Sequence, residues 1–124
     1  MANLATREIK AFVPARDFEL SISFYQSLGF AVGSVFGEVA YLSKGECAFL
    51  LQDFYEPVHC ENYMMHLLVE DARSWHQHVA QSGVETEFGT TLTELQQQPW
   101  GMLEFCMTDP SGVLWRIAEH IRTV

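Results

Sequence analysis

The stretch "DPSGVLWRIAEH" (Asp109–His120) reads as a tight turn followed by a short, strongly apolar strand. The Pro-Ser-Gly sequence favours the turn, and the hydrophobic run after Gly112 favours the strand. Arg116 interrupts this run between Trp115 and Ile117. Because an unpaired charge is costly to bury, the guanidinium requires either an anionic ligand or an acidic partner such as Glu104, Asp53 or Glu119.

The composition is that of one folded domain, which we expect to cover residues 1–124. The chain is 48% hydrophobic, and no apolar run approaches the roughly 18 residues that span a bilayer. The segment "MANLATREIK" lacks the apolar core of a signal peptide. The three cysteines are odd in number and lack a CxxC motif, which favours reduced thiols. We therefore expect a cytoplasmic protein.

The net charge of −9 comes from 16 acidic and 7 basic residues. Nucleic acids and anionic membrane surfaces both require clustered cations, so the balance argues against either as a partner. An acidic protein is compatible with a cationic ligand, although acidity also serves solubility alone.

The first half of the chain, about residues 5–53, reads as β-α-β-β-β. A β-rich run covers Glu8–Pro14, and a helix follows with Asp17 as its N-cap and Gly29 as its stop. Three short strands separated by Gly-containing turns complete the unit, at "FAVGSVF" (30–36), "VAYLS" (39–43) and "CAFLLQ" (47–52).

The second half, about residues 62–121, repeats this order. A strand over 63–69 precedes a helix from near Asp71 to Gly83, and these helix ends lie 54 residues after Asp17 and Gly29. The remaining segments are "VETEF" (84–88) in the second-strand position, a Gln-rich loop over 89–98, and strands at "GMLEFCM" (101–107) and "VLWRIAEH" (113–120). We therefore predict an α+β fold built from two tandem βαβββ units.

Two stretches at opposite ends of this repeat carry a family resemblance. "FVPARDFELSISFYQSLGF" (12–30) and "QPWGMLEFCMTDPSGVLWRIAE" (98–119) resemble the opening and closing motifs of the glyoxalase/bleomycin-resistance/extradiol-dioxygenase superfamily, the vicinal-oxygen-chelate fold. The resemblance implies a curved mixed sheet with an open cleft and helices on the outer face. It also implies a homodimer, because many members complete the cleft across a subunit interface.

Enzymatic members of this family hold a metal at four strand positions, typically with His or Glu. The resemblance places these positions on Lys10, Met64, Arg116, and either Phe49 or Leu51. Lysine and arginine are cations, and a thioether is a soft, weak ligand for divalent metals. We therefore expect no metal and no other cofactor.

Trp100 follows the Gln-rich loop, where bleomycin-resistance proteins border their ligand crevice. It is thus either a stacking surface for a flat aromatic ligand or an anchor for the loop. His66 projects to the same side as Met64 and serves either as a ligand contact or base, or as a structurally satisfied histidine. The predicted ligand-binding residues are Lys10, Phe12, Phe49, Leu51, Met64, His66, Trp100 and Arg116.

The function favoured by these observations is metal-independent binding of a small molecule, similar to the antibiotic-sequestering members of the family. The alternative is a glyoxalase-like lyase or isomerase with a non-standard metal site or a metal-free mechanism. In the metal-free case His66 is the base and Arg116 the anion anchor.

Overall fold

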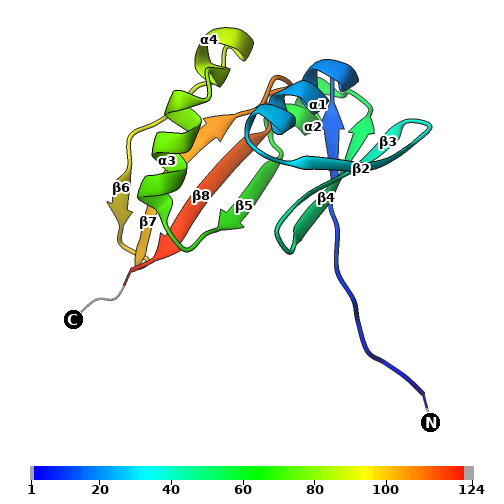
Figure 1. Cartoon of the computed structure of the whole chain (residues 1–124), viewed down its shortest axis with the longest axis horizontal. Helices are drawn as coiled ribbons and strands as arrows, with labels where there is room; N and C mark the ends of the chain where they lie inside the picture. The colour runs from blue at the N-terminus through cyan, green and yellow to red at the C-terminus, as the bar shows by residue number, and fades with distance from the viewer. Residues whose placement is uncertain (1, 122–124) are drawn as a thin grey trace.

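The computed structural model describes residues 2–121, which form two four-stranded sheets with helices (Figure 1). The first sheet has the order β1-β4-β3-β2, and the second has the order β5-β8-β7-β6. In each sheet the outer first strand runs parallel to the last strand, and the other pairs are antiparallel. The strands are β1 Phe12–Ala15, β2 Ala31–Phe36, β3 Val39–Lys44, β4 Cys47–Asp53, β5 Met64–Leu68, β6 Gln96–Gln98, β7 Met102–Thr108 and β8 Leu114–His120. The predicted α+β repeat is confirmed.

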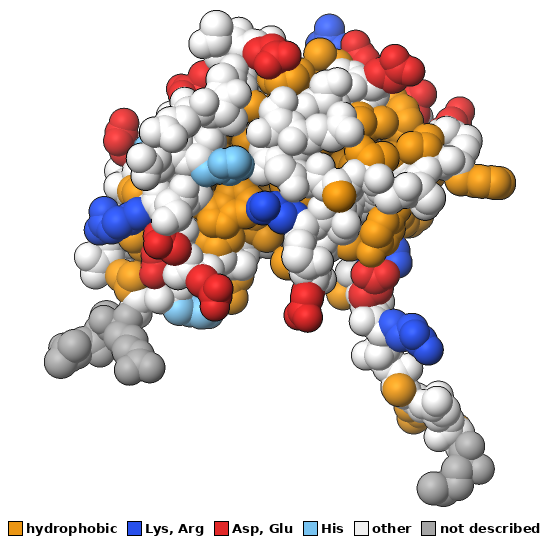
Figure 2. Space-filling view, in the orientation of Figure 1, with side chains coloured by type: hydrophobic (Ala, Val, Ile, Leu, Met, Phe, Trp, Pro, Cys, Tyr) orange, Lys and Arg blue, Asp and Glu red, His pale blue; other side chains and the backbone are white. Residues whose placement is uncertain are grey.

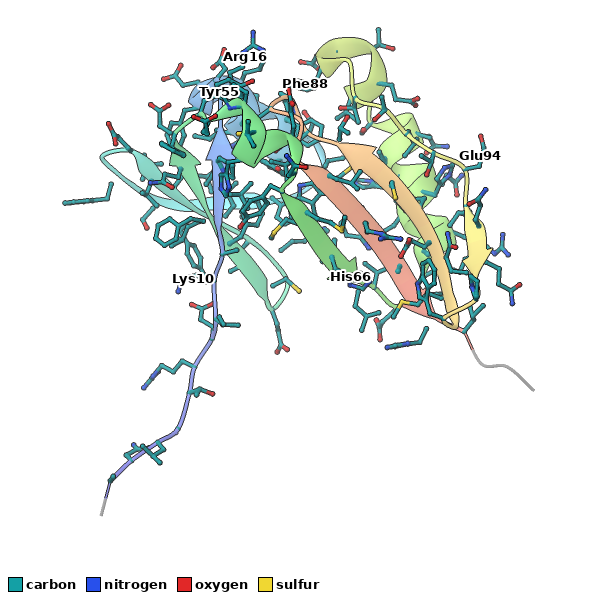
Figure 3. All side chains as sticks on the ribbon, turned by 180° about the vertical axis from the view of Figure 1, so that it is seen from behind. Lys10, Arg16, Tyr55, His66, Phe88 and Glu94 are labelled. Carbon is teal, nitrogen blue, oxygen red and sulfur yellow. The ribbon has the colours of Figure 1, made fainter. Side chains whose placement is uncertain are left out.

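The helices are α1 Phe18–Ser27, α2 Pro57–Glu61, α3 Ala72–Gln81 and α4 Val84–Phe88. Helices α1 and α3 lie in front of the sheets in Figure 1, whereas α2 lies in front of the strands in the reverse view (Figure 3). Among residues 2–121, no helix has the length and apolarity needed to cross a lipid bilayer.

Both predicted N-caps are confirmed. The Asp17 side chain accepts a hydrogen bond from the Leu20 amide at 3.1 Å, and Asp71 accepts one from the Ser74 amide at 3.0 Å. These bonds satisfy backbone donors that a helix start leaves without an intrahelical partner. Gly29, just after α1, has φ +100°, a backbone angle that favours glycine.

The predicted second strand of the second unit was wrong. Residues 84–88 form α4, and the strand is β6 in the Gln-rich segment that was expected to be a loop. Val84 is buried and Phe88, one helical turn later, packs against the core, so the two share a helix face. Strand β6 has no apolar alternation and is defined by its antiparallel pairing with Met102–Glu104.

The first strand also begins later than the predicted Glu8. Residues 2–11 lie outside the strands and form an arm that projects away from the body (Figure 1). Leu4 is 87% exposed and Ile9 is 97% exposed on this arm. The arm thus leaves large apolar side chains in solvent.

One hydrophobic core joins the two units. Aromatic side chains meet at its centre, where the ring of Trp115 from β8 lies 5.6 Å from Tyr25 of α1 and 5.3 Å from Phe49 of β4. All three side chains are almost completely buried. Because these residues come from both halves of the chain, the units pack as a single body.

A buried hydrogen-bond chain crosses this core. The Tyr25 hydroxyl donates to Asp109 Oδ2 at 2.6 Å and accepts from Trp115 Nε1 at 2.9 Å. Asp109 Oδ1 accepts from the Ser111 and Val113 amides, which fixes the turn before β8. Burial raises the pKa of Asp109, although the hydrogen bond from Tyr25 opposes that rise. The carboxylate therefore depends on its donors for stability in the core.

We expect Tyr25→Phe to lower the free energy of unfolding by about 1–3 kcal/mol, because it leaves a buried carboxylate oxygen and an indole N–H without their partner. Urea unfolding at neutral pH measures the change. Tyr55→Phe is the matched control, since Tyr55 is 38% exposed and its loss should stay within about 0.5 kcal/mol. Equal stability of the two variants would contradict a structural role for this hydrogen-bond chain.

Candidate functional site

The face of the second sheet opposite α3 carries most of the predicted ligand-binding residues. Met64, His66 and Leu68 project from β5 onto this face and are exposed, whereas the alternate residues Met65 and Leu67 pack against the core. Met64 is 54% exposed and Leu68 49%. The strand thus presents apolar surface on both sides of a histidine, as the two-residue strand period requires.

His66, Arg116 and Cys106 form a row across three adjacent strands. The register pairs His66 of β5 with Arg116 of β8, and Arg116 with Cys106 of β7. Paired residues on neighbouring strands project to the same face, so these three side chains are neighbours. Burial raises the pKa of the Cys106 thiol, which keeps it protonated and weakly nucleophilic near neutral pH.

Arg116 is paired with Glu104, one of the three acidic partners that the sequence suggested. Nη2 and Nε of Arg116 donate to Glu104 Oε1 at 2.6 and 3.1 Å. The Glu104 side chain is only 2% exposed, whereas that of Arg116 is 30% exposed. The hydrogen bonds that Arg116 donates to the Glu104 carboxylate raise the pKa of Arg116. The pair therefore places a neutralised cation on the sheet surface.

Trp100 covers this cation from the β6–β7 turn. The Arg116 guanidinium lies 5.6 Å from the centre of the Trp100 ring, within the range of a cation–π contact. Trp100 is nevertheless 57% exposed. Gly101, with φ +79°, allows the tight turn that brings the indole over the sheet. Both interpretations of Trp100 are therefore compatible with the geometry, because Arg116 anchors the ring while the ring still exposes a surface on which a ligand could stack.

Lys10 and Phe12 lie on the first sheet rather than beside Arg116. Lys10 precedes β1, forms an ion pair with Glu8 at 2.8 Å and lies 5.7 Å from the centre of the Tyr41 ring. Phe12 is 51% exposed on β1. Figure 3 shows Lys10 at the root of the arm and His66 on the neighbouring sheet. The structure therefore separates the predicted residues into two groups.

Phe49 and Leu51 face the core, with exposed fractions of 2% and 0%. The register pairs Phe12 with Leu50, just as it pairs His66 with Arg116. Leu50 is therefore the counterpart of Arg116, and the sequence-based assignment to Phe49 or Leu51 was one residue out. A one-residue shift moves a side chain to the opposite face of a strand.

A cavity of about 310 Å³ lies between the arm and β5. His66 and Phe49 both line it, together with Ile9 of the arm, so it brings two of the predicted residues together. The cavity connects the open face to the edge of the aromatic core.

The four positions that the family resemblance assigns to metal ligands carry no side chain suited to a divalent metal. With the register correction these positions fall on Lys10, Leu50, Met64 and Arg116, none of which offers a carboxylate, imidazole or thiolate. Between residues 2 and 121, no three His, Cys, Asp or Glu side chains gather as ligands for an ion.

Sequence reasoning named Glu104 only as one of three possible partners of Arg116, and it missed Cys106 and Leu50. The available signal was the strand period. Glu104 and Cys106 are two positions apart on one strand and must share a face. Placing that face on the same side of the sheet as Arg116 required the register between β7 and β8, which depends on the length of the intervening turn.

A family model described as the Glyoxalase/Bleomycin resistance protein/Dioxygenase superfamily matches residues 9–117. A comparison with curated protein sequences finds no match to this chain.

Three solved structures illustrate the fold similarity. A bleomycin resistance determinant encoded on transposon Tn5 has a TM-score of 0.82 and 20% identity, covering 93% of this chain and 98% of its own. A bleomycin-binding protein complexed with bleomycin has a TM-score of 0.81 and 23% identity, covering 93% and 99%. A lactoylglutathione lyase from Agrobacterium tumefaciens has a TM-score of 0.68 and 14% identity, covering 94% and 96%. These TM-scores show a shared fold.

We expect Arg116→Met to destabilise the protein by about 2–3 kcal/mol at neutral pH, because it leaves the Glu104 carboxylate buried without its cation. Denaturant unfolding at pH 7 measures the change.

The double variant Arg116→Met/Glu104→Met is the control, because removing both charges together should recover most of the stability. A single variant as stable as the native chain would contradict the importance of the ion pair.

Proposed function

We propose that this chain, which belongs to the glyoxalase/bleomycin resistance protein/dioxygenase superfamily, binds a small organic molecule on the open face of its second sheet and needs no metal to do so. The observation that carries the proposal is the Trp100–Arg116–Glu104 stack. In it the Arg116 guanidinium donates a hydrogen bond to the buried Glu104 carboxylate and makes a cation–π contact with the exposed Trp100 indole. A ring fixed in this way presents flat apolar surface at little entropic cost.

The chemistry of this face favours a flat aromatic ligand. Trp100 offers its ring, and Met64 beside Arg116 offers a polarisable thioether, with its Sδ 4.0 Å from Arg116 Nη1. Exposed His66 adds a hydrogen-bonding group in the same row. The face therefore combines a stacking surface with a few polar contacts, as small-molecule sites commonly do.

A cationic antibiotic fits this face better than the bare sequence suggests. Arg116 would repel a cationic ligand if it were unpaired, but Glu104 neutralises it at 2.6 Å. The net charge of −9 attracts cations over a longer range. Solved structures of similar fold bear the names bleomycin resistance determinant and bleomycin-binding protein, which supports antibiotic sequestration as the biological role.

Metal independence rests on the donor chemistry of this chain. Lys10, Leu50, Met64 and Arg116 occupy the four positions at which the family's enzymes hold a metal. None of these side chains is a ligand for a divalent ion. The proposed binding is therefore direct contact between the ligand and protein side chains.

A glyoxalase-like lyase or isomerase is the second candidate, because exposed His66 lies beside Arg116 and a lactoylglutathione lyase has the same fold. The ion pair argues against it, since two donor nitrogens of Arg116 are already bound to Glu104. An enzyme of this type would show a pH–rate profile governed by a group near pH 6.5.

We also propose that the protein is a cytoplasmic homodimer. Exposed apolar side chains gather at the arm and the two outer strands: Ile9 at 97% exposure, Phe12 at 51% and Met64 at 54%. Single exposed apolar residues are ordinary, but a group of them on adjoining segments is typical of an interaction surface. A second copy that covers this group would also enclose the open face and complete a crevice around Trp100.

Titration with metal-free bleomycin and a panel of flat aromatic antibiotics tests the binding proposal. We expect Trp100→Ala to weaken the tightest ligand by at least about tenfold, equal to about 1.4 kcal/mol, and Trp100→Phe to keep most of the affinity. Calorimetry with and without a chelator measures both. Equal affinities for the native chain and Trp100→Ala would contradict the stacking role, and loss of binding with chelator would contradict metal independence.

Sedimentation at micromolar concentration tests the dimer. We expect a dimer for the native chain and a shift toward monomer for Ile9→Asp, because the charge would be buried without a partner in the interface. Val58→Asp is the control, since Val58 is 70% exposed on α2, away from the arm. A native chain that sediments as a monomer would overturn the proposal.

A further inference from the structure

A groove lined by residues of both units lies beside α3, and none of its lining residues belongs to the stack at Trp100. The main cavity measures about 310 Å³, within the range of small-molecule sites. A smaller cavity of about 210 Å³ shares Lys44, Ser74 and Trp75 with it and adds His78. We call the two together the seam groove. Figure 2 shows hydrophobic and cationic surface adjoining on this side of the molecule.

Lys44 places a cation in the seam groove without an acidic partner. Its Nζ lies 5.4 Å from the centre of the Trp75 ring. In residues 2–121 the ion pairs of lysine and arginine are Lys10 with Glu8 and Arg116 with Glu104, so Lys44 has none. Gly29 makes room for the ammonium, because a Cβ there would lie 3.1 Å from Nζ. The ammonium donors therefore remain open to an anionic group.

Glu70 supplies the opposite charge in the same groove. Its exposed carboxylate has no hydrogen bond or ion pair to another described residue. Its neighbour Asp71 is already engaged as the α3 cap by the amide and hydroxyl of Ser74. Lys44 and Glu70 thus line one groove but stay beyond ion-pair distance of each other. Two opposite charges held apart match a ligand that carries both signs.

The wall of the seam groove is apolar and fixed. Phe30 is buried in the core, and Leu67 and Trp75 are partly buried against it. His78 Nε2 donates to the Leu28 carbonyl at 2.8 Å, which ties α3 of the second unit to the end of α1 in the first. The two sides of the groove are therefore connected before any ligand arrives, which reduces the entropic cost of binding.

We propose that the seam groove binds a free α-amino acid with an apolar side chain. The carboxylate of the ligand pairs with Lys44, its ammonium group pairs with Glu70, and its hydrocarbon side chain packs against Phe30, Leu67 and Trp75. This site shares none of the residues of the Trp100 stack. The inference is therefore independent of the proposed function.

Titration of the full chain with L-leucine tests the proposal, with calorimetry for affinity and the NMR signal of the Trp75 indole N–H for location. N-acetyl-L-leucine lacks the ammonium charge and L-leucinamide lacks the carboxylate. We expect each analogue to bind at least about tenfold more weakly than leucine. Failure of leucine to bind at millimolar concentrations, or equal binding of all three compounds, would overturn the proposal.

Charge variants identify the two partners. We expect Lys44→Gln and Glu70→Gln each to weaken leucine binding about tenfold. Lys44→Gln should no longer distinguish leucine from leucinamide, and Glu70→Gln should no longer distinguish leucine from N-acetyl-leucine. Arg73→Gln and Glu94→Gln, at exposed positions that do not line the groove, should bind as the native chain does.

Glu70 is exposed, so its variant tests the site even if Lys44→Gln affects folding. Variants that keep the full discrimination between the analogues would overturn the assignment of Lys44 and Glu70. Because the experiment uses neither Trp100 nor an aromatic drug, its failure leaves the binding proposal for the open face unchanged.

Discussion

The hydrogen-bond chain from Trp115 through Tyr25 to Asp109 is the constraint that aligns the two units. Hydrophobic packing alone would bring the halves together without fixing their angle, because apolar contact is not directional. A buried carboxylate is different, since every oxygen must find a donor. Asp109 obtains its donors from the second unit's own turn and from a helix of the first unit, so both must be in place together.

This constraint also determines which side chains form the open face. Trp115 must point into the core to reach Tyr25, and strand alternation then turns Arg116 outward. Arg116 in turn reaches Glu104, which is almost fully buried on the neighbouring strand. Removing the Glu104 carboxylate from water costs free energy. Two hydrogen bonds donated by the Arg116 guanidinium offset that cost only when their geometry is good. The site residues are thus fixed by the core beneath them.

Much of this arrangement could be predicted from sequence, and the rest depended on non-local pairing. Asp17 and Asp71 could be placed at the helix starts from sequence, because N-capping is a local hydrogen bond between a side chain and a backbone amide of the next turn. Strand β6 consists of three glutamines and forms only because it pairs with β7. No local sequence pattern predicts that pairing. The family resemblance placed the fourth ligand position on Phe49 or Leu51, one residue away from Leu50. That residue mattered, because Phe49 and Leu51 are buried and Leu50 lies on the other side of the strand.

Local pairing, rather than net charge, decides what each surface can bind. The chain carries a net charge of −9, and this field attracts cations from a distance. At contact distance, the charge that a surface presents to a ligand depends on how each cation on that surface is paired. Arg116 is neutralised by Glu104, so a surface that holds a guanidinium still tolerates a cationic ligand. Lys44 rests on an indole, which leaves its charge intact and directed into a groove. Two cations in one acidic protein therefore differ in the positive charge that they present, because one has a carboxylate for a partner and the other an aromatic ring.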